Sequence, residues 1–152
     1  NIKIKNNKLY ICNKRVYSKY CGSDISFTSK DGWIDTGDSV AIKKDRVLFR
    51  GREDGVINVG GDKVYPEEVE NELLKHPLVA AARVYAKPNP ITGFLVAADV
   101  TLVDSNTDEK EARKVLQTYS LEALDRHKAL ASITIVPRFD LNSSGKIVRE
   151  VL

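Results

Sequence analysis

Two apolar segments constrain the fold of this chain more than any other feature: LVAAARVYA at residues 78–86 and FLVAADVTL at residues 94–102. Short, nearly continuous apolar runs bounded by turn residues are typical of buried strands. The segment between them contains Pro and Gly and predicts a turn. We therefore expect both segments to be strands of one small sheet.

Helical patterns flank these two strands. Residues 66–75 begin with Pro66, which suits the first position of a helix because the N–H groups there have no partner within the helix. Two glutamates follow and favour the positive end of the helix dipole, and Pro77 ends the helix. A second, longer helix is predicted to start at Asp108, with Thr107 as its cap.

Short strands are predicted before the first helix, at residues 56–61, and after the second, at residues 133–136. From residue 56 the expected order is β-α-β-β-α-β. This order predicts an α+β fold in which the helices pack on one small sheet.

The N-terminal part is predicted to be a small β-rich segment. Residues 8–20 are rich in Ile, Val and Tyr and predict one or two strands, and residues 40–44 and 46–50 predict a hairpin. The turn formers between residues 21 and 38 predict a loop.

The polar sequence GREDG, at residues 51–55, predicts a domain boundary. The charge balance changes sign there. Residues 1–53 carry 12 Lys and Arg against 6 Asp and Glu, a net +6, whereas residues 54–152 carry 12 against 15, a net −3. We therefore expect one domain segment over residues 1–54 and a second domain over residues 55–152.

The composition argues against several classes of function. The net charge is +3, and there is no basic stripe interleaved with aromatic residues, so we expect no nucleic-acid partner. No apolar run approaches the ~20 residues of a membrane-spanning helix. Cys12 and Cys21 are too few for a disulfide framework and lie far along the chain from His76 and His127. We expect no metal site in this chain and a reducing, cytoplasmic location. Because the first residue is Asn1 rather than Met, we expect the chain to be part of a longer protein.

Three polar clusters carry side chains of the kinds that bind ligands and stabilise charge in catalysis. In DTGD, at residues 35–38, a carboxylate on a turn can accept hydrogen bonds from two hydroxyls, as a ribose diol requires. GREDG is followed by GGDK at residues 60–63, which combines a guanidinium with glycines that let a ligand approach the backbone. NSSGK, at residues 142–146, presents a lysine that can meet negative charge on a phosphate or carboxylate. Each cluster alone is also typical of a solvated surface loop.

The joint order of these clusters resembles the C-terminal portion of the AMP-forming acyl-CoA synthetases, members of the adenylate-forming superfamily. The resemblance is carried by GWIDTGD at residues 32–38, GREDGVINVGGDKVYPEEVE at residues 51–70 and NSSGKIVR at residues 142–149. It covers residues 27–152, and residues 8–26 fit less distinctly as the end of a larger domain.

The resemblance implies roles in forming an acyl-adenylate from a carboxylic acid and ATP. Asp38 and Arg52 match the residues that hold the ribose of ATP or AMP. Lys63 matches a basic residue that can reach the nucleotide phosphate, and Lys146 matches the lysine required for adenylate formation. Many members carry Leu-Pro where this chain has Phe139 and Asp140.

The resemblance also implies a second half-reaction, in which the thiol of coenzyme A displaces AMP. Asp54 matches the hinge about which the C-terminal lid rotates between the two steps. Gly60 and Gly61 match the segment that then lines the tunnel for the pantetheine arm. The implied small molecules are therefore a carboxylic acid, ATP or AMP and coenzyme A, with Mg²⁺ accompanying ATP in the full-length enzyme.

Two alternatives remain open. The acceptor thiol can instead be the phosphopantetheine of a carrier protein, as in other adenylation enzymes. The chain can also be a non-catalytic interaction module that has kept the lid fold, although such a module has no need for Asp38, Arg52 and Lys146.

Overall fold

The structure is a computed structural model and describes residues 1–13, 29, 31–140, 143 and 147. The chain divides into two units, Asn1–Gly55 and Val56–Leu152. This division lies beside the boundary expected between residues 54 and 55. The assignment of the first unit to the end of a larger domain stays a prediction, and each unit is described by itself.

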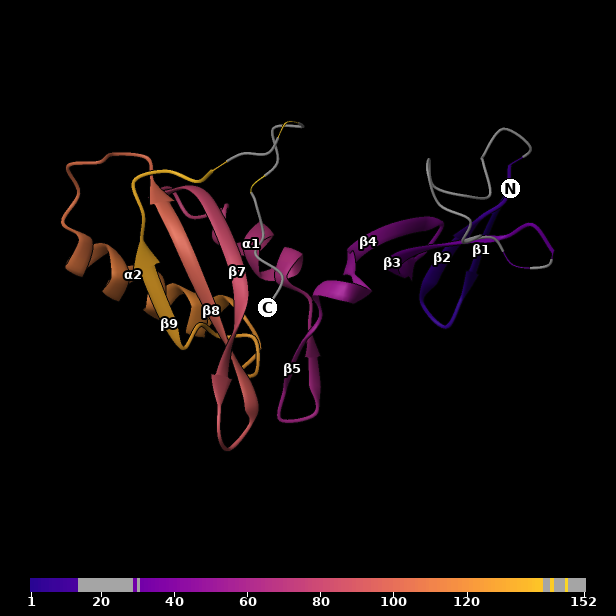
Figure 1. The fold of residues 1–152 in the computed structure, drawn as a ribbon. Coiled ribbons are helices and arrows are strands. Elements are labelled where there is room, and N and C mark those ends of the chain that lie inside the picture. The colour runs from indigo at the N-terminus through magenta and orange to yellow at the C-terminus, as the bar shows by residue number, and fades with distance from the viewer. Residues whose placement is uncertain (14–28, 30, 141–142, 144–146, 148–152) are drawn as a thin grey trace. The chain divides into compact units, whose positions relative to one another are not determined.

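The first unit contains an antiparallel sheet with the strand order β1-β2-β3-β4 (Figure 1). Its elements are β1 (Ile2–Lys5), β2 (Lys8–Ile11), β3 (Ile34–Lys43), β4 (Arg46–Arg52) and the 3₁₀ turn η1 (Glu53–Gly55). The predicted hairpin is confirmed, because β3 and β4 pair as far as Lys43 and Arg46. The first strand, β1, was not predicted. Of the one or two strands expected over residues 8–20, β2 is present, and residues 14–20 lie outside the described part of the chain.

The expected loop at DTGD is wrong, because these residues belong to strand β3. Asp35 pairs with Tyr10 and Ser39 pairs with Lys8, so residues 36–38 face the single residue Leu9. The extra residues form a β-bulge in which the Thr36 hydroxyl donates to the Leu9 carbonyl at 3.0 Å. The turn-forming residues therefore mark a bulge within a strand rather than a loop.

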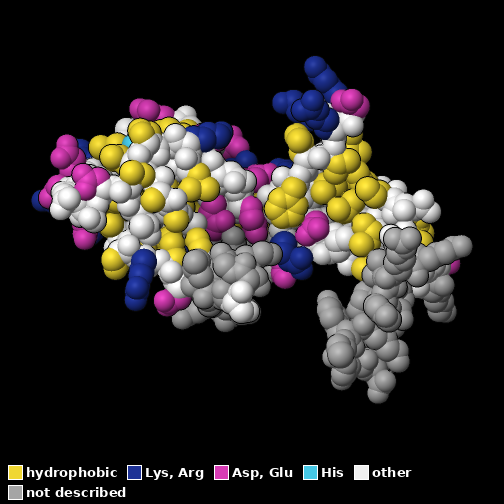
Figure 2. All heavy atoms as spheres, turned by 90° about the horizontal axis from the view of Figure 1, so that it is seen from above, with side chains coloured by type: hydrophobic (Ala, Val, Ile, Leu, Met, Phe, Trp, Pro, Cys, Tyr) yellow, Lys and Arg dark blue, Asp and Glu magenta, His cyan; other side chains and the backbone are white. Residues whose placement is uncertain are grey.

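Hydrophobic side chains are exposed on the first unit. Figure 2 shows them in yellow next to a group of lysine and arginine side chains. Three consecutive residues of β4 are 43–56% exposed, and Ile42 on β3 is 66% exposed. Because consecutive residues of a strand point to opposite faces, both faces of this hairpin present apolar surface.

The second unit is a five-stranded sheet with two helices. Its elements are β5 (Ile57–Val59), β6 (Asp62–Val64), α1 (Pro66–Leu73), β7 (Val79–Asn89), β8 (Gly93–Leu102), α2 (Glu109–Ala123) and β9 (Ser132–Ile135). Strands β7 and β8 form the long antiparallel pair that the two apolar segments predict. Along its other edge, β8 pairs with β5 at Gly93 and runs parallel to β9 from Ala97 to Val100.

Both helices pack against one face of this sheet (Figure 1). The core there joins alternate residues of β7 and β8 to the apolar faces of α1 and α2, with Val69, Leu73 and Leu116 fully buried. Because strand side chains alternate, the intervening residues of β7, β8 and β9 lie on the opposite face. The predicted α+β class is confirmed.

Two local expectations in the second unit are wrong. Strand β6 was not predicted. It forms because Gly60 and Gly61, at φ 60° and 101°, turn the chain back after β5, as the two central residues of a type I′ hairpin do. The cap of α2 is Asp108 rather than Thr107, since the Asp108 carboxylate accepts the Glu111 N–H at 2.7 Å. Among the described residues, no helix combines the length and apolar character needed to cross a membrane.

Removal of core volume from α2 tests this packing. Leu116 is fully buried, so Leu116→Ala should lower the free energy of unfolding by about 2–5 kcal/mol. Leu121→Ala on the same helix is the matched control, because Leu121 is 61% exposed, and it should cost less than about 0.5 kcal/mol. Urea unfolding followed at the helix band of the circular dichroism spectrum reports the second unit, which holds both α-helices. Equal losses for the two variants would contradict the packing.

Candidate functional site

Strand register brings Asp38 and Arg52 together in the first unit. The two residues are Cα partners across β3 and β4, and the Arg52 Nη1 group lies 3.5 Å from Asp38 Oδ1. The same Nη1 group donates to the Thr36 carbonyl at 3.3 Å. Residues that are 14 apart in sequence thus place a carboxylate and a guanidinium side by side on one sheet.

The Arg52 guanidinium is also held by Asp54 in the turn η1. Arg52 Nε lies 3.1 Å from Asp54 Oδ1, and Nη2 lies 3.4 Å from Asp54 Oδ2, so the carboxylate receives both sides of the fork. The predicted hinge residue therefore orients the predicted ribose-binding arginine. Asp54 is the second-last residue of the first unit, which ends at Gly55.

Because Gly37 has no side chain, it leaves room for the Arg52 guanidinium. A Cβ atom added at this position would lie 3.0 Å from Arg52 Nη2, and the backbone has φ +71°, which side chains other than glycine rarely adopt. The Gly37 N–H donates to the Asp35 carboxylate at 2.9 Å. The bulge in β3 therefore admits the guanidinium beside Asp38.

Solvent reaches this cluster. The side chains of Arg52, Asp38 and Asp54 are 51%, 27% and 71% exposed. Exposed ion pairs contribute only about 0–1 kcal/mol to stability. On this open surface, carboxylate oxygens that accept hydrogen bonds lie beside guanidinium N–H groups that donate them. A pair of vicinal hydroxyls, which both donate and accept, can bind to both kinds of group.

A second group of predicted residues lies in the hairpin of β5 and β6. The Gly60 N–H donates to the Thr92 carbonyl at 3.0 Å, and the Gly61 N–H donates to Asn58 Oδ1 at 2.9 Å. Gly61 faces open space, since an added Cβ would have no atom within 4 Å. Lys63 is exposed on β6. The turn geometry alone accounts for both glycines, and it also leaves bare backbone at the tip of the hairpin.

The predicted site residues that the structure describes therefore fall into two groups. Asp38, Arg52 and Asp54 form one hydrogen-bonded cluster in the first unit. Gly60, Gly61 and Lys63 lie together in a hairpin of the second unit. Lys146 lies outside the described residues, and its role stays a prediction.

Sequence reasoning missed a second acid–base pair, on β7 and β8. Arg83 and Asp99 are Cα partners, and Arg83 Nη2 lies 2.6 Å from Asp99 Oδ2. The signal was one charged residue inside each of the two apolar segments. A charged residue within a buried strand requires a partner, and the facing strand supplies it.

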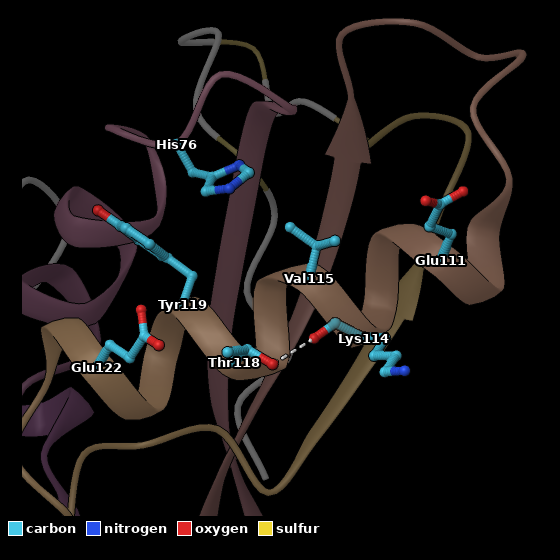
Figure 3. Close-up of a pocket in the computed structure, with 7 residues that line it drawn as sticks. All are labelled: His76, Glu111, Lys114, Val115, Thr118, Tyr119 and Glu122. Atoms are coloured by element: carbon cyan, nitrogen blue, oxygen red, sulfur yellow. Dashed lines mark hydrogen bonds between the residues drawn. The ribbon is translucent and has the colours of Figure 1, made fainter.

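An open hollow of about 520 Å³ lies beside α2 (Figure 3). Its lining residues come from α2, apart from one histidine that follows α1: His76, Glu111, Lys114, Val115, Thr118, Tyr119 and Glu122. The Tyr119 and His76 rings meet edge to face with centroids 4.9 Å apart. None of the residues predicted from sequence lines this hollow.

A model of a known protein family matches most of the second unit. The family model described as "AMP-binding enzyme C-terminal domain" matches residues 68–146.

Curated relatives align over most of this chain. The acetyl-coenzyme A synthetase of Bacillus subtilis is 32% identical over 128 residues, which cover 84% of this chain and 22% of that protein. The fatty acid–acyl-carrier-protein ligase ScoC of Streptomyces coeruleorubidus is 36% identical over 126 residues, which cover 82% of this chain and 24% of that protein. The chain thus spans about a quarter of the length of these relatives.

A solved structure shares the fold. The o-succinylbenzoate CoA synthetase MenE of Bacillus subtilis, in complex with the acyl-adenylate intermediate OSB-AMP, superposes with a TM-score of 0.82 at 26% identity. The match covers 97% of this chain and 32% of that one. The same synthetase in complex with ATP and a magnesium ion gives a TM-score of 0.79 at 25% identity, with the same coverage.

The contact between α2 and α1 predicts a pH-dependent contribution to stability. The Tyr119 hydroxyl donates to Glu72 Oε1 at 3.1 Å. The Lys75 ammonium, and after it this hydroxyl, lower the pKa of Glu72 below its ordinary value of 4.5. A lowered pKa means that Glu72 stabilises the fold above pH 4.5 and that this contribution is lost as the pH falls through the pKa of the folded state.

Tyr119→Phe removes one of these hydrogen bonds and should lower the free energy of unfolding at pH 7 by about 0.5–1.5 kcal/mol. The difference from wild type should shrink as the pH falls through the lowered pKa of Glu72. Urea unfolding at a series of pH values and an NMR titration of the Glu72 carboxyl, which locates its pKa, measure these effects. Tyr10→Phe in the first unit is the control. A difference that is unchanged below the measured pKa of Glu72 would contradict this assignment.

Proposed function

The chain belongs to the family of AMP-binding enzyme C-terminal domains, and on this premise we propose that it is the C-terminal part of an ATP-dependent acid–CoA ligase. The complete enzyme activates a carboxylic acid as acyl-AMP and transfers the acyl group to coenzyme A. The cross-strand pair of Asp38 and Arg52, with Arg52 oriented by Asp54, supports this proposal most strongly.

The described residues fit the ribose of the nucleotide. The Asp38 carboxylate accepts hydrogen bonds from the two hydroxyls, and the Arg52 guanidinium donates to their oxygens. The space at Gly37 lets both groups lie at the same exposed edge of the bulge. Because Asp54 holds Arg52 from the other side, the guanidinium is oriented before the nucleotide binds.

The first unit is proposed to be the end of a larger nucleotide-binding domain, with the hinge at Asp54. The exposed apolar hairpin of β3 and β4 supports this, because its side chains lack the cover that a core gives. The greater length of the relatives also supports it. The residues that select the acid then lie in that domain.

In the first half-reaction, the carboxylate of the acid attacks the α-phosphorus of ATP and pyrophosphate leaves. Lys146 is proposed to bridge the carboxylate and α-phosphate oxygens. Its ammonium group stabilises the negative charge on the α-phosphate oxygens in the transition state and keeps the two reactants in line. Lys63 is proposed to meet the nucleotide phosphate.

In the second half-reaction, the thiolate of coenzyme A attacks the carbonyl carbon of acyl-AMP and AMP leaves. We propose that rotation about Asp54 exchanges Lys146 for the hairpin of β5 and β6 at the reacting centre. The bare backbone at Gly60 and Gly61 then lines the path of the pantetheine arm.

Mg²⁺ is expected to accompany ATP in the complete enzyme. Within residues 1–13, 29, 31–140, 143 and 147, no group of three or more His, Cys, Asp or Glu residues is placed to hold a metal ion. The described residues therefore do not fit a metal site, and no step is assigned to them through the metal. We place the enzyme in the cytoplasm, where the free thiol of Cys12 stays reduced.

A carrier-protein thiol is the second candidate acceptor. One relative is a fatty acid–acyl-carrier-protein ligase, and its 36% identity exceeds the 32% of the acetyl-coenzyme A synthetase of Bacillus subtilis. Both acceptors end in the same phosphopantetheine thiol. Thioester formation with free coenzyme A and with a phosphopantetheinylated carrier protein, compared in the complete enzyme, separates the two.

Lys146→Ala tests the catalytic assignment in the full-length protein. Adenylate formation, measured by ATP–pyrophosphate exchange with acetate, octanoate and benzoate, should fall about 10²–10³-fold. Thioester formation from supplied acyl-AMP should stay within about twofold of wild type. Lys110→Ala, at an exposed position on α2, is the control.

Equal losses in both half-reactions of Lys146→Ala would contradict the role of the lysine. If the wild-type protein catalyses neither half-reaction with any of the three acids, the non-catalytic interaction module is the better description.

Asp38→Asn tests the ribose contact. The amide keeps the shape of the side chain but replaces one acceptor with a donor, so the KM for ATP should rise about tenfold to a hundredfold. Steady-state kinetics of the full-length protein measure this, with Asp45→Asn in the exposed hairpin turn as the control. An unchanged KM for ATP would remove Asp38 from the nucleotide site.

A further inference from the structure

The tips of two hairpins lie against each other in the second unit (Figure 1). One is the turn between β5 and β6, which holds the two glycines of the second predicted group. The other is the turn between β7 and β8, over residues 89–93. Strand β5 pairs with β8 at Val59 and Gly93, and the Gly60 N–H donates to the Thr92 carbonyl at 3.0 Å. The β7–β8 turn therefore holds the β5–β6 turn from outside.

The Asn89 side chain keeps the β7–β8 turn in shape. Its Oδ1 atom accepts the N–H groups of Ile91 and Thr92, each at 3.0 Å. The Thr92 hydroxyl lies 3.2 Å from the same oxygen and 2.9 Å from the Phe94 carbonyl oxygen. An asparagine side chain that bonds to the backbone two residues further on takes the place of a backbone turn. One amide oxygen thus fixes the residue whose carbonyl accepts from Gly60.

The β5–β6 turn needs such a contact because its own backbone is permissive. Gly60 and Gly61 have φ values of 60° and 101°, and glycine adopts many other conformations at little cost. The Gly61 N–H is held within the hairpin, by Asn58 Oδ1 at 2.9 Å, whereas the Gly60 N–H is held by the neighbouring tip. A displacement of Thr92 is therefore passed on to Gly60.

We propose that Asn89 is a positioning residue for thioester formation: through Thr92, it fixes the glycine turn along which the pantetheine arm passes. This inference rests on the proposed function, in which the bare backbone at Gly60 and Gly61 lines the path of that arm. A thiolate must approach the carbonyl carbon of acyl-AMP along a defined line, and an error of about 1 Å can cost about a hundredfold in rate. The contacts from Asn89 to Gly60 are direct and lie within one unit.

A purely structural role for Asn89 predicts a different result. The side chain then only stabilises the tip of β7 and β8, which belong to the sheet that carries the whole unit. Its loss would change both half-reactions together or change neither. A positioning role predicts a loss confined to the step that uses the thiol, together with a less protected Gly60 N–H.

Three variants of the full-length protein separate these roles. Asn89→Ala removes the accepting oxygen at a position outside the hydrophobic core, so the variant should fold. Asn89→Asp keeps an oxygen that can accept from the same two N–H groups. Asp104→Ala is the matched control, because Asp104 Oδ1 accepts the Asn106 N–H at 2.9 Å in a similar turn at the opposite end of β8.

The assays measure each half-reaction and the glycine turn itself. The acid is whichever of acetate, octanoate and benzoate gives the fastest ATP–pyrophosphate exchange in wild type. The acceptor is coenzyme A or a phosphopantetheinylated carrier protein, whichever wild type uses faster with supplied acyl-AMP. Hydrogen–deuterium exchange of peptides that cover residues 57–64, followed by mass spectrometry, reports the protection of the Gly60 N–H.

In Asn89→Ala we expect the kcat/KM for the acceptor thiol to fall about tenfold, while ATP–pyrophosphate exchange stays within about threefold of wild type. Hydrogen exchange over residues 57–64 should become faster, because the Gly60 N–H loses a fixed acceptor. Asn89→Asp and Asp104→Ala should match wild type in all three measurements. Unchanged thioester formation by Asn89→Ala, equal losses in both half-reactions, or a failure of Asn89→Asp to restore the thiol step would overturn the positioning role.

Gly61→Leu in the same assays separates this inference from the proposed function, because it places a side chain on the proposed path of the arm. If Gly61→Leu loses thioester formation selectively while Asn89→Ala does not, only the positioning role fails. If Gly61→Leu shows no selective loss, the proposed role of the glycine turn fails and the inference fails with it. If no acid supports exchange in wild type, the proposed function itself fails.

Discussion

Antiparallel strand register places an acidic side chain opposite a basic one in each of the two sheets. In the first unit it pairs Asp38 with Arg52, and in the second it pairs Arg83 with Asp99. The first pair is exposed and adds little to stability, so its geometry is available to a ligand. The second pair is largely buried and holds a guanidinium against an aromatic ring. In both sheets, the register therefore decides which charged side chains meet.

Much of the second unit could be predicted because its patterns are strong. The two apolar segments became β7 and β8, and Pro66 and Pro77 bracket the first helix. These features follow from burial and from the missing N–H of proline, which act locally. The residues proposed for the nucleotide site came from a resemblance in sequence. What the structure adds is the cluster that joins Asp38, Arg52 and Asp54.

The remaining features depend on contacts between distant segments. Turn-forming residues at 35–38 predict a loop, and only pairing with β2 shows that they form a bulge. Strand β6 has three residues, too few for a recognisable alternation. The contact of Arg83 with Phe139 joins residues 56 positions apart, and no local pattern encodes it. Local propensity therefore predicts where elements form, whereas register decides which side chains meet.

The central claim is that the bulge of β3 and the end of β4 hold the nucleotide ribose. A crystal structure of the full-length protein with AMP tests it most directly, through the distances from Asp38 and Arg52 to the ribose hydroxyls. The account predicts that the Asp38 carboxylate accepts from both hydroxyls at about 2.5–3.0 Å and that Arg52 donates to the same ribose. An AMP molecule whose ribose is bound by other residues, with Asp38 and Arg52 in solvent, would contradict it.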